Sequence, residues 1–323
     1  MNVLKIIKMA RYELDSIRTN NVVSAMWGDE EVLQAVNTSM EEAASVLRAA
    51  DSPYLKRIIR SDGATMDLIS EVYDPASLAV VPDQLDYVLP PDCVSIVSIR
   101  ALGDQFSGVR FRPAKDTQKA FVDQLSIQTS DLGTVEAGDA TYWYTRVGDQ
   151  GLRIVPMPKN DIDVELTYYY RPAKLRYYST GTVSGTVSLL PVTGSSTLWY
   201  SAGLREPAEL MLSLASITAV DLSTVYPSVR SIVDDTTLTM KRPNATTFGP
   251  VAYFLAMIPT LPQEHHAWLA QMTAACMMRK VSIELSDKMK AELRAQLVSK
   301  VQPEVVRDQV QESYAVEPFE LPS

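Results

Sequence analysis

Two stretches with apolar residues at helical spacing lie at opposite ends of this sequence, and most of the sequence between them is strand-forming. A helix has to bury its apolar stripe against another element. We therefore predict an α+β fold in which two N-terminal helices and one long C-terminal helix form a helical bundle core. β-rich domains are inserted between these helices, and an extended C-terminal tail follows.

The two N-terminal helices are indicated by their apolar stripes. The first is expected over residues 2–18, with its stripe at Val3, Ile6, Ile7, Ala10 and Leu14. The second begins at Asp29, the expected N-cap, and ends before Asp51-Ser52-Pro53, because the residue before a proline is pushed out of the α region. Its stripe consists of Leu33, Val36, Met40, Ala43, Ala44 and Leu47.

A single long helix is predicted after Pro262 and up to Ser299. Its stripe consists of Trp268, Leu269, Met272, Cys276, Ile283, Met289, Leu293 and Leu297. If the ends of the chain meet, one set of side chains from the second helix packs against one set from this helix. The two sets are Leu33, Val36, Met40 and Leu47 on one side, and Leu269, Met272, Leu293 and Leu297 on the other.

The last residues, 301–323, combine prolines with an excess of acidic residues. Alone, such a segment buries too little apolar surface to offset its ordering entropy. We expect it to be extended and to need a partner surface. Its candidate anchors are Tyr314, Phe319 and Leu321.

The middle of the chain shows strand and turn patterns. A half-buried strand is expected over residues 94–99, and residues 142–146 and 152–156 flank a Gly-Asp-Gln-Gly hairpin turn. Another strand is expected over residues 164–172, where a proline ends it, and a short helix is expected over 117–125. Short Ser/Thr-rich strands between 177 and 259 indicate a small sandwich or barrel. Residues 207–220 fit a strand pair or a helix equally well.

These patterns divide the chain into five parts. They are an N-terminal helical part of the core (1–62), a β-rich domain (63–176), an inserted small β-barrel or sandwich (177–259), a C-terminal core helix (260–300) and an extended C-terminal arm (301–323).

Composition excludes several classes of protein. A formal net charge of −9 argues against sequence-nonspecific DNA binding, which needs basic residues to neutralise phosphates. Only two cysteines, Cys93 and Cys276, are present, so a disulfide framework is excluded. No apolar run reaches membrane-spanning length, and the first residues indicate an amphipathic helix and not a signal peptide.

No catalytic, cofactor or metal site is predicted. His265 and His266 are adjacent and so point about 100° apart on a helix; we expect one to face solvent and one to pack near Trp268. Cys276 is expected to be a core thiol, and Asp234-Asp235 to belong to a turn. The remaining candidates are the aromatic runs 142–144 and 168–170, expected to pack across strands and not to stack on bases, and Met277-Met278, which fit a core or an interface equally well.

With these parts placed, the chain resembles the bacteriophage head-to-tail adaptor (connector) proteins of short-tailed phages. The resemblance is carried by three stretches: Trp27-Gly28-Asp29-Glu30-Glu31 with the helix after it, the strand entry 87–92, and the hairpin strands 152–158 and 166–172. A second resemblance is to a small β-barrel module of phage virion proteins. It is carried by residues 181–183, 192–199, 226–229 and 235–243, with Met240 where the module has a final Leu.

The resemblance implies a virion protein at the head–tail junction, present in the host cytoplasm during assembly. It implies a ring of neighbouring adaptor subunits, commonly twelve, bound beneath the portal protein. The next neck or tail protein (a nozzle, tube or fibre) docks on this ring, and genomic DNA passes through it without specific binding. The C-terminal anchors are then expected to bind the portal or a neighbouring subunit, and neither a membrane nor a cofactor is implied.

Two other functions remain open from the residues. One is another virion structural component, in the tail tube or tail tip, with the β module as its main working part. The other is a carbohydrate-active enzyme with a β accessory domain, although the sequence shows no pair of acids that would form its pocket.

Overall fold

A computed structural model of the chain describes residues 1–16, 26–62, 74–103, 108–114, 141–186, 189–212, 228–242 and 247–314. The chain forms two compact units, one made of Met1–Tyr54 with Pro172–Ser323 and the other of Leu55–Arg171. The second unit is thus a continuous insertion in the sequence of the first. The finer five-part division remains a prediction.

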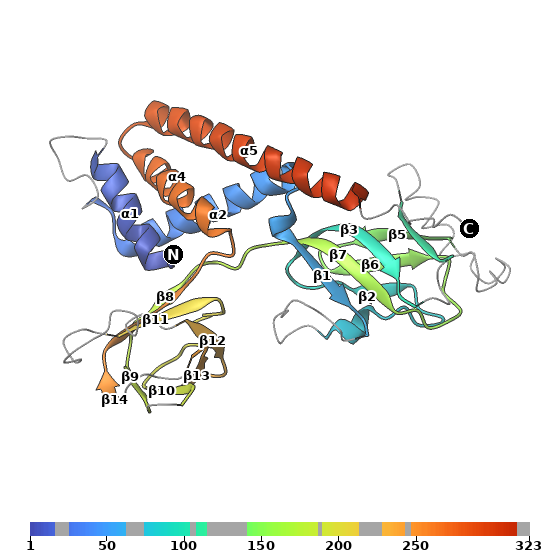
Figure 1. Ribbon diagram of the computed structural model, residues 1–323, viewed down its shortest axis with the longest axis horizontal. Coiled ribbons are helices and arrows are strands. Elements are labelled where there is room, and N and C mark those ends of the chain that lie inside the picture. The colour runs from blue at the N-terminus through green and yellow to red at the C-terminus, as the bar shows by residue number, and fades with distance from the viewer. Residues whose placement is uncertain are drawn as a thin grey trace, which may run out of the picture. The chain divides into compact units, whose positions relative to one another are not determined.

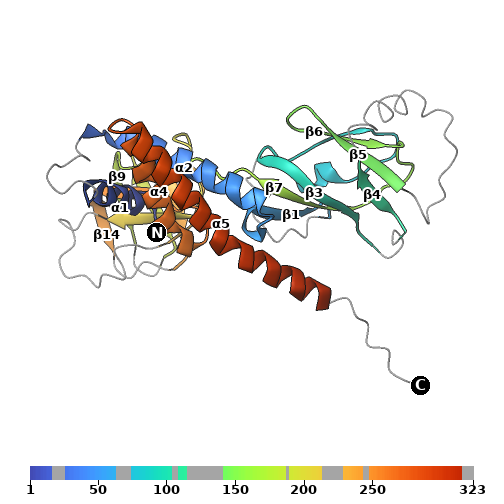
Figure 2. The ribbon, with the colours of Figure 1, turned by 90° about the horizontal axis from the view of Figure 1, so that it is seen from above.

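The first unit contains the four α-helices of the described residues. These are α1 (Val3–Ser16), α2 (Asp29–Ala49), α4 (His266–Met278) and α5 (Ile283–Tyr314). Helix α4 contacts the other three, and α5 lies along both α4 and α2 (Figures 1 and 2). Short 3-10 turns occur at Pro53–Leu55, Pro75–Leu78 and Gln263–His265.

The apolar stripes of the N-terminal helices are largely as predicted. All five predicted side chains of α1 are buried. In α2, Leu33 is only partly buried and Val32 takes its place in the core. The predicted N-cap is also wrong: Gly28 caps α2, and the side chain of Glu31 accepts a hydrogen bond from the Gly28 N–H at 3.2 Å. Asp29 instead accepts from Arg11 of α1 at 2.7 Å.

The predicted single C-terminal helix is two helices. Helix α4 ends at Met278 and α5 begins at Ile283. Between them Ser282 acts as the N-cap of α5, because its hydroxyl oxygen accepts a hydrogen bond from the Leu285 N–H at 3.3 Å. This break lets α5 run back along α4. There, Trp268 Nε1 donates to the Leu293 carbonyl and the Ser286 hydroxyl donates to the Ala275 carbonyl, both at 2.7 Å.

The extended arm predicted for residues 301–323 is corrected over its first part, because α5 continues to Tyr314, and residues 315–323 lie outside the described residues. The prediction depended on the prolines and the acidic residues of this segment. The first proline, Pro303, removes one backbone hydrogen bond and costs about 3 kcal/mol inside a helix. Several strong helix formers follow the proline. They are Glu304, Arg307, Gln309, Gln311 and Glu312.

The second unit is built on a seven-stranded sheet in the order β1-β7-β3-β4-β5-β6-β2. The strands are β1 (Lys56–Arg60), β2 (Asp86–Val88), β3 (Cys93–Ala101), β4 (Arg110–Pro113), β5 (Thr141–Val147), β6 (Gly151–Val155) and β7 (Val164–Tyr170). The pairing is antiparallel except between β4 and β5. The predicted strand over 94–99, the hairpin and the strand over 164–172 are confirmed as β3, β5–β6 and β7, and β7 ends two residues earlier than predicted. The predicted helix over 117–125 lies outside the described residues.

The predicted strand entry at residues 87–92 ends in a polar anchor. The Asp92 carboxylate accepts hydrogen bonds from the Arg57 guanidinium and, at 3.1 Å, from the Tyr168 hydroxyl. The Asp92 carbonyl accepts from the Arg171 N–H at 2.8 Å. Burial is the main cause that raises the pKa of Tyr168, so this phenol remains a donor. Asp92 therefore joins β1, β7 and the start of β3.

The remaining strands belong to the first unit and form two sheets. The five-stranded sheet has the order β12 (Val229–Ile232), β13 (Thr237–Met240), β10 (Pro191–Ser195), β9 (Thr182–Gly185) and β14 (Phe248–Val251). The three-stranded sheet has the order β11 (Ala208–Leu212), β15 (Tyr253–Met257) and β8 (Tyr177–Tyr178). In their shared core Trp199 Nε1 donates to the Tyr253 hydroxyl at 2.7 Å. Within the unsettled stretch 207–220, residues 208–212 are strand, and residues 213–220 lie outside the described residues.

The α+β class is confirmed. A helical bundle as the core of the chain is not supported, because the chain is strand-rich and its sheets have buried side chains of their own. The four helices nevertheless make one packed layer. The predicted contacts of α2 with the C-terminal helices are present, and every predicted contact residue except Leu33 is buried.

Leu47→Ala should lower the free energy of unfolding by about 2–5 kcal/mol, because this fully buried side chain leaves a cavity between helices. Leu33→Ala, on the same helix, is the matched control and should cost at most about half as much, since Leu33 is partly exposed. Urea unfolding followed by circular dichroism measures both. Equal losses would show that Leu47 is not in the packed layer.

Candidate assembly site

The three C-terminal anchors predicted from the sequence are only partly described. Tyr314 is the last residue of α5. Phe319 and Leu321 lie outside the described residues. Their binding to the portal or to a neighbouring subunit therefore remains a prediction.

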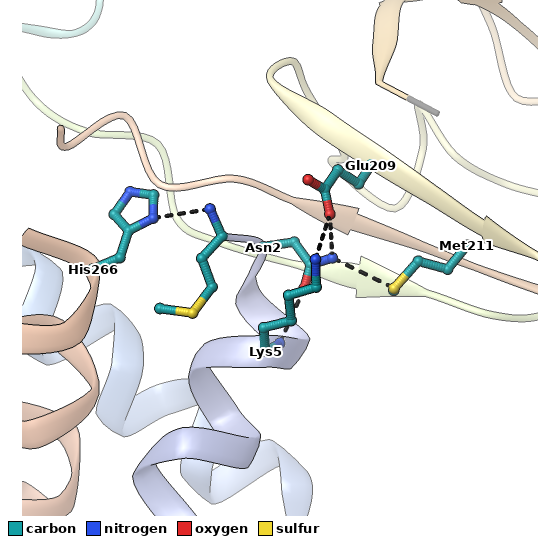
Figure 3. A network of polar contacts seen from close by, with 6 residues as sticks. Asn2, Lys5, Glu209, Met211 and His266 are labelled. Carbon is teal, nitrogen blue, oxygen red and sulfur yellow. Dashed lines mark hydrogen bonds and ion pairs between the residues drawn. The ribbon is translucent and has the colours of Figure 1, made fainter. Parts of the chain in front are cut away.

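A polar joint connects the start of α1 to strand β11 (Figure 3). Asn2 precedes α1, and its side-chain oxygen accepts a hydrogen bond from the Lys5 N–H at 3.0 Å, which caps the helix. The Asn2 amide nitrogen donates to Glu209 Oε2 at 2.7 Å and lies 3.4 Å from the sulfur of Met211. Lys5 Nζ approaches the same Glu209 oxygen at 3.6 Å.

His266, the first residue of α4, completes this joint from the other side. Its Nε2–H donates to the Leu261 carbonyl at 2.9 Å, which leaves Nδ1 to accept from the Met1 amino nitrogen at 3.0 Å. Both nitrogens are thus used by the neutral ring. Burial is the largest cause that lowers the pKa of His266, in agreement with this neutral form.

The joint fixes the strands of the first unit to its helices. Glu209 stands on β11, which pairs with β15 along its whole length, and β15 also contacts α1. The side-chain nitrogen and the side-chain oxygen of Asn2 each have a hydrogen-bond partner, and Glu209 is paired with two donors. The arrangement positions these elements relative to one another.

The other candidates of the sequence have structural roles. His265 and His266 are both buried, so the expected solvent-facing histidine is wrong. Asp234 and Asp235 belong to a turn, as predicted. Asp234 accepts from the Thr236 N–H at 2.7 Å, and Asp235 accepts from the Ser201 hydroxyl at 2.6 Å and from its N–H. These bonds lower the pKa of both carboxyls.

Alternate residues of the aromatic runs and both paired methionines are core residues. Tyr142, Tyr144, Tyr168 and Tyr170 are buried in the seven-stranded sheet, which confirms cross-strand packing. Met277 and Met278 are fully buried in α4. The Cys276 sulfur, half-buried, lies 3.6 Å from the Ser39 hydroxyl of α2.

Comparison with known proteins identifies the family. Residues 1–209 match the family model described as SU10 adaptor protein, which is 209 of the 323 residues. The chain belongs to the SU10 adaptor protein family. It is therefore a bacteriophage adaptor and a viral structural protein. A search of curated proteins found no match to the chain.

Among the described residues, no helix is both long and apolar enough to cross a membrane. Within the same part of the chain, no group of three or more His, Cys, Asp or Glu side chains is arranged to hold a metal ion.

Sequence reasoning missed the polar joint. Asn2 and Glu209 are 207 positions apart, and neither belongs to a motif. Asn2 could have been found as the N-cap of the first helix, because asparagine is strongly preferred there. Nothing in the sequence indicates that its amide also binds Glu209.

Glu209→Ala should lower the free energy of unfolding by about 1–3 kcal/mol, because the fully buried Asn2 amide loses its charged acceptor. Hydrogen exchange should rise in β11 and at the start of α1 together. Glu292→Ala, at an exposed site on α5, is the control and should change neither. Faster exchange in β11 alone would mean that the joint does not couple the two elements.

Proposed function

We propose that the protein is a head-to-tail adaptor that forms a ring beneath the portal, extends the DNA channel and receives the next neck or tail component. The observation that carries this proposal is the family match over residues 1–209. Membership of an adaptor family implies interaction with the portal and tail proteins of a phage. A ring of about twelve copies in a short-tailed phage, with the Ser/Thr-rich strands as a small β-barrel module, is what the sequence resemblance adds to this proposal.

The fold supports a role in joining proteins. The described residues supply two compact units with separate cores, and the strands of the first unit are fixed to its helices through Asn2, Glu209 and His266. Such units can present separate surfaces to separate partners. The negative net charge of −9 suits a channel that lets DNA pass, because few basic residues are present to retain phosphates.

The test is electron microscopy of the purified protein with and without the portal. We expect the free protein to be largely monomeric, because acidic subunits repel one another at low salt, and we expect rings on the portal. A protein that assembles on tail tubes or tail tips and ignores the portal would instead support the other structural role.

The role of the C-terminal anchors is tested by a variant that lacks them and by a control variant elsewhere on the surface. Replacement of Tyr314, Phe319 and Leu321 together by alanine should leave a folded protein that no longer joins portal-bearing heads, because its apolar docking groups are gone. Tyr12→Ala is the control, since Tyr12 is 75% exposed on α1 and should not matter. Normal incorporation of the triple variant would show that these residues are dispensable for the joint.

A further inference from the structure

Strand register places arginines side by side on the solvent face of the seven-stranded sheet. Arg60 of β1 lies opposite Glu165 of β7, Glu165 lies opposite Arg100 of β3, and Arg100 lies opposite Arg110 of β4. Arg112 is two residues further along β4 and is exposed on the same face. The opposite face carries the buried side chains, such as Ile59 and Leu166.

Three of these arginines form no ion pair in the described part of the chain, although Glu165 is the cross-strand neighbour of Arg100. Arg60 pairs with Asp62 at 2.9 Å, but Arg100, Arg110 and Arg112 are exposed and form no ion pair with any described residue. We call these three the arginine face. Arg100 and Arg110 are direct cross-strand neighbours, and like charges at such positions are destabilising. An anionic partner would remove this repulsion.

We propose that the arginine face binds the acidic C-terminal segment, residues 304–323, of a second copy of this chain. The segment contains five acidic residues and one basic residue, Arg307. The acidic residues are Glu304, Asp308, Glu312, Glu317 and Glu320. The proposal deepens the proposed ring, from which it takes the expectation that two copies lie side by side.

The spacing of the acidic residues in the C-terminal segment is similar to the spacing of the arginines in the arginine face. The first three acids follow at intervals of four in the part of the sequence that continues α5, which corresponds to about 6 Å along a helix. Arg110 and Arg112 are two residues apart on a strand, which corresponds to about 7 Å. Guanidinium groups also bind carboxylates through two parallel hydrogen bonds.

Duplex DNA is the other polyanion that the arginine face could bind. The chain as a whole carries a net charge of −9, and three arginines neutralise few phosphates. A short acidic peptide brings less total charge near the acidic remainder of the protein. The C-terminal segment is therefore the better match.

The experiment measures fluorescence anisotropy of a labelled synthetic peptide, residues 301–323, titrated with the full chain at low salt. We expect saturable binding that weakens about tenfold or more when Arg100, Arg110 and Arg112 are all changed to Gln. The matched control changes Arg230, Arg242 and Arg279, exposed arginines of the first unit, to Gln and should leave the affinity unchanged. A peptide with its five acids replaced by amides should not bind.

Charge reversal distinguishes a loss of peptide binding caused by the missing charges from a loss caused by misfolding. A chain with R100E, R110E and R112E should bind a peptide in which the five acids are replaced by lysine, and should not bind the natural peptide. A full chain whose own five acids are replaced by amides should bind the natural peptide with unchanged affinity.

Four results would overturn the proposal. The first is an equal loss of peptide affinity in the two arginine triple variants, and the second is no rescue of binding by the reversed charges. The third is binding of labelled duplex DNA but not of the peptide. The fourth is tighter peptide binding when the chain's own acids are neutralised, which would mean that the segment occupies the arginine face of its own chain. Rings that form on the portal despite any of these results would leave the proposed function standing.

Discussion

The packing of α1 and α2 on α4 is the contact on which the first unit depends. These helices come from opposite ends of the sequence, and neither end can bury its apolar stripe without the other. Leu14 and Leu47 from the N-terminal helices and Leu269 from α4 are all fully buried. Because the ends must meet, residues 55–171 are held as an insertion with its own sheet and core.

Polar contacts then connect this packed layer of helices to the strands of the first unit. Asn2 caps α1 and at the same time binds Glu209 of β11, so the start of the first helix is tied to strands much later in the sequence. His266 begins α4 at the same place. A joint of this kind keeps the strands and helices of the first unit in a fixed arrangement.

The sequence predicted elements well where one pattern decides. The apolar stripe of α1 and the alternation in β3 and β7 were enough to predict a helix and two strands, because apolar residues with a period of 3.6 indicate a helix and those with a period of 2 indicate a strand. It failed where two local preferences compete. Pro303 signals the end of a helix, yet the helix formers after it carry α5 to Tyr314. The turn between α4 and α5 has no proline or glycine, so the stripe alone predicted one helix.

Long-range polar contacts were beyond the reach of sequence patterns. Asn2 with Glu209, and Asp92 with Arg57 and Tyr168, are set by tertiary packing and by no spacing rule. The arginine face is different. Arg110 and Arg112 alternate with Phe111, and this alternation is a strand signal that could have placed both side chains on one solvent face.

Closure of the two ends is tested most directly by native-state hydrogen exchange with a single perturbation in α4. Leu269→Ala removes a fully buried side chain there. If the ends form one packed layer, exchange should rise together in α4, α1 and α2, although about 200 residues or more separate them, and remain unchanged in the seven-stranded sheet. Faster exchange confined to α4, with α1 and α2 unaffected, would contradict the closure.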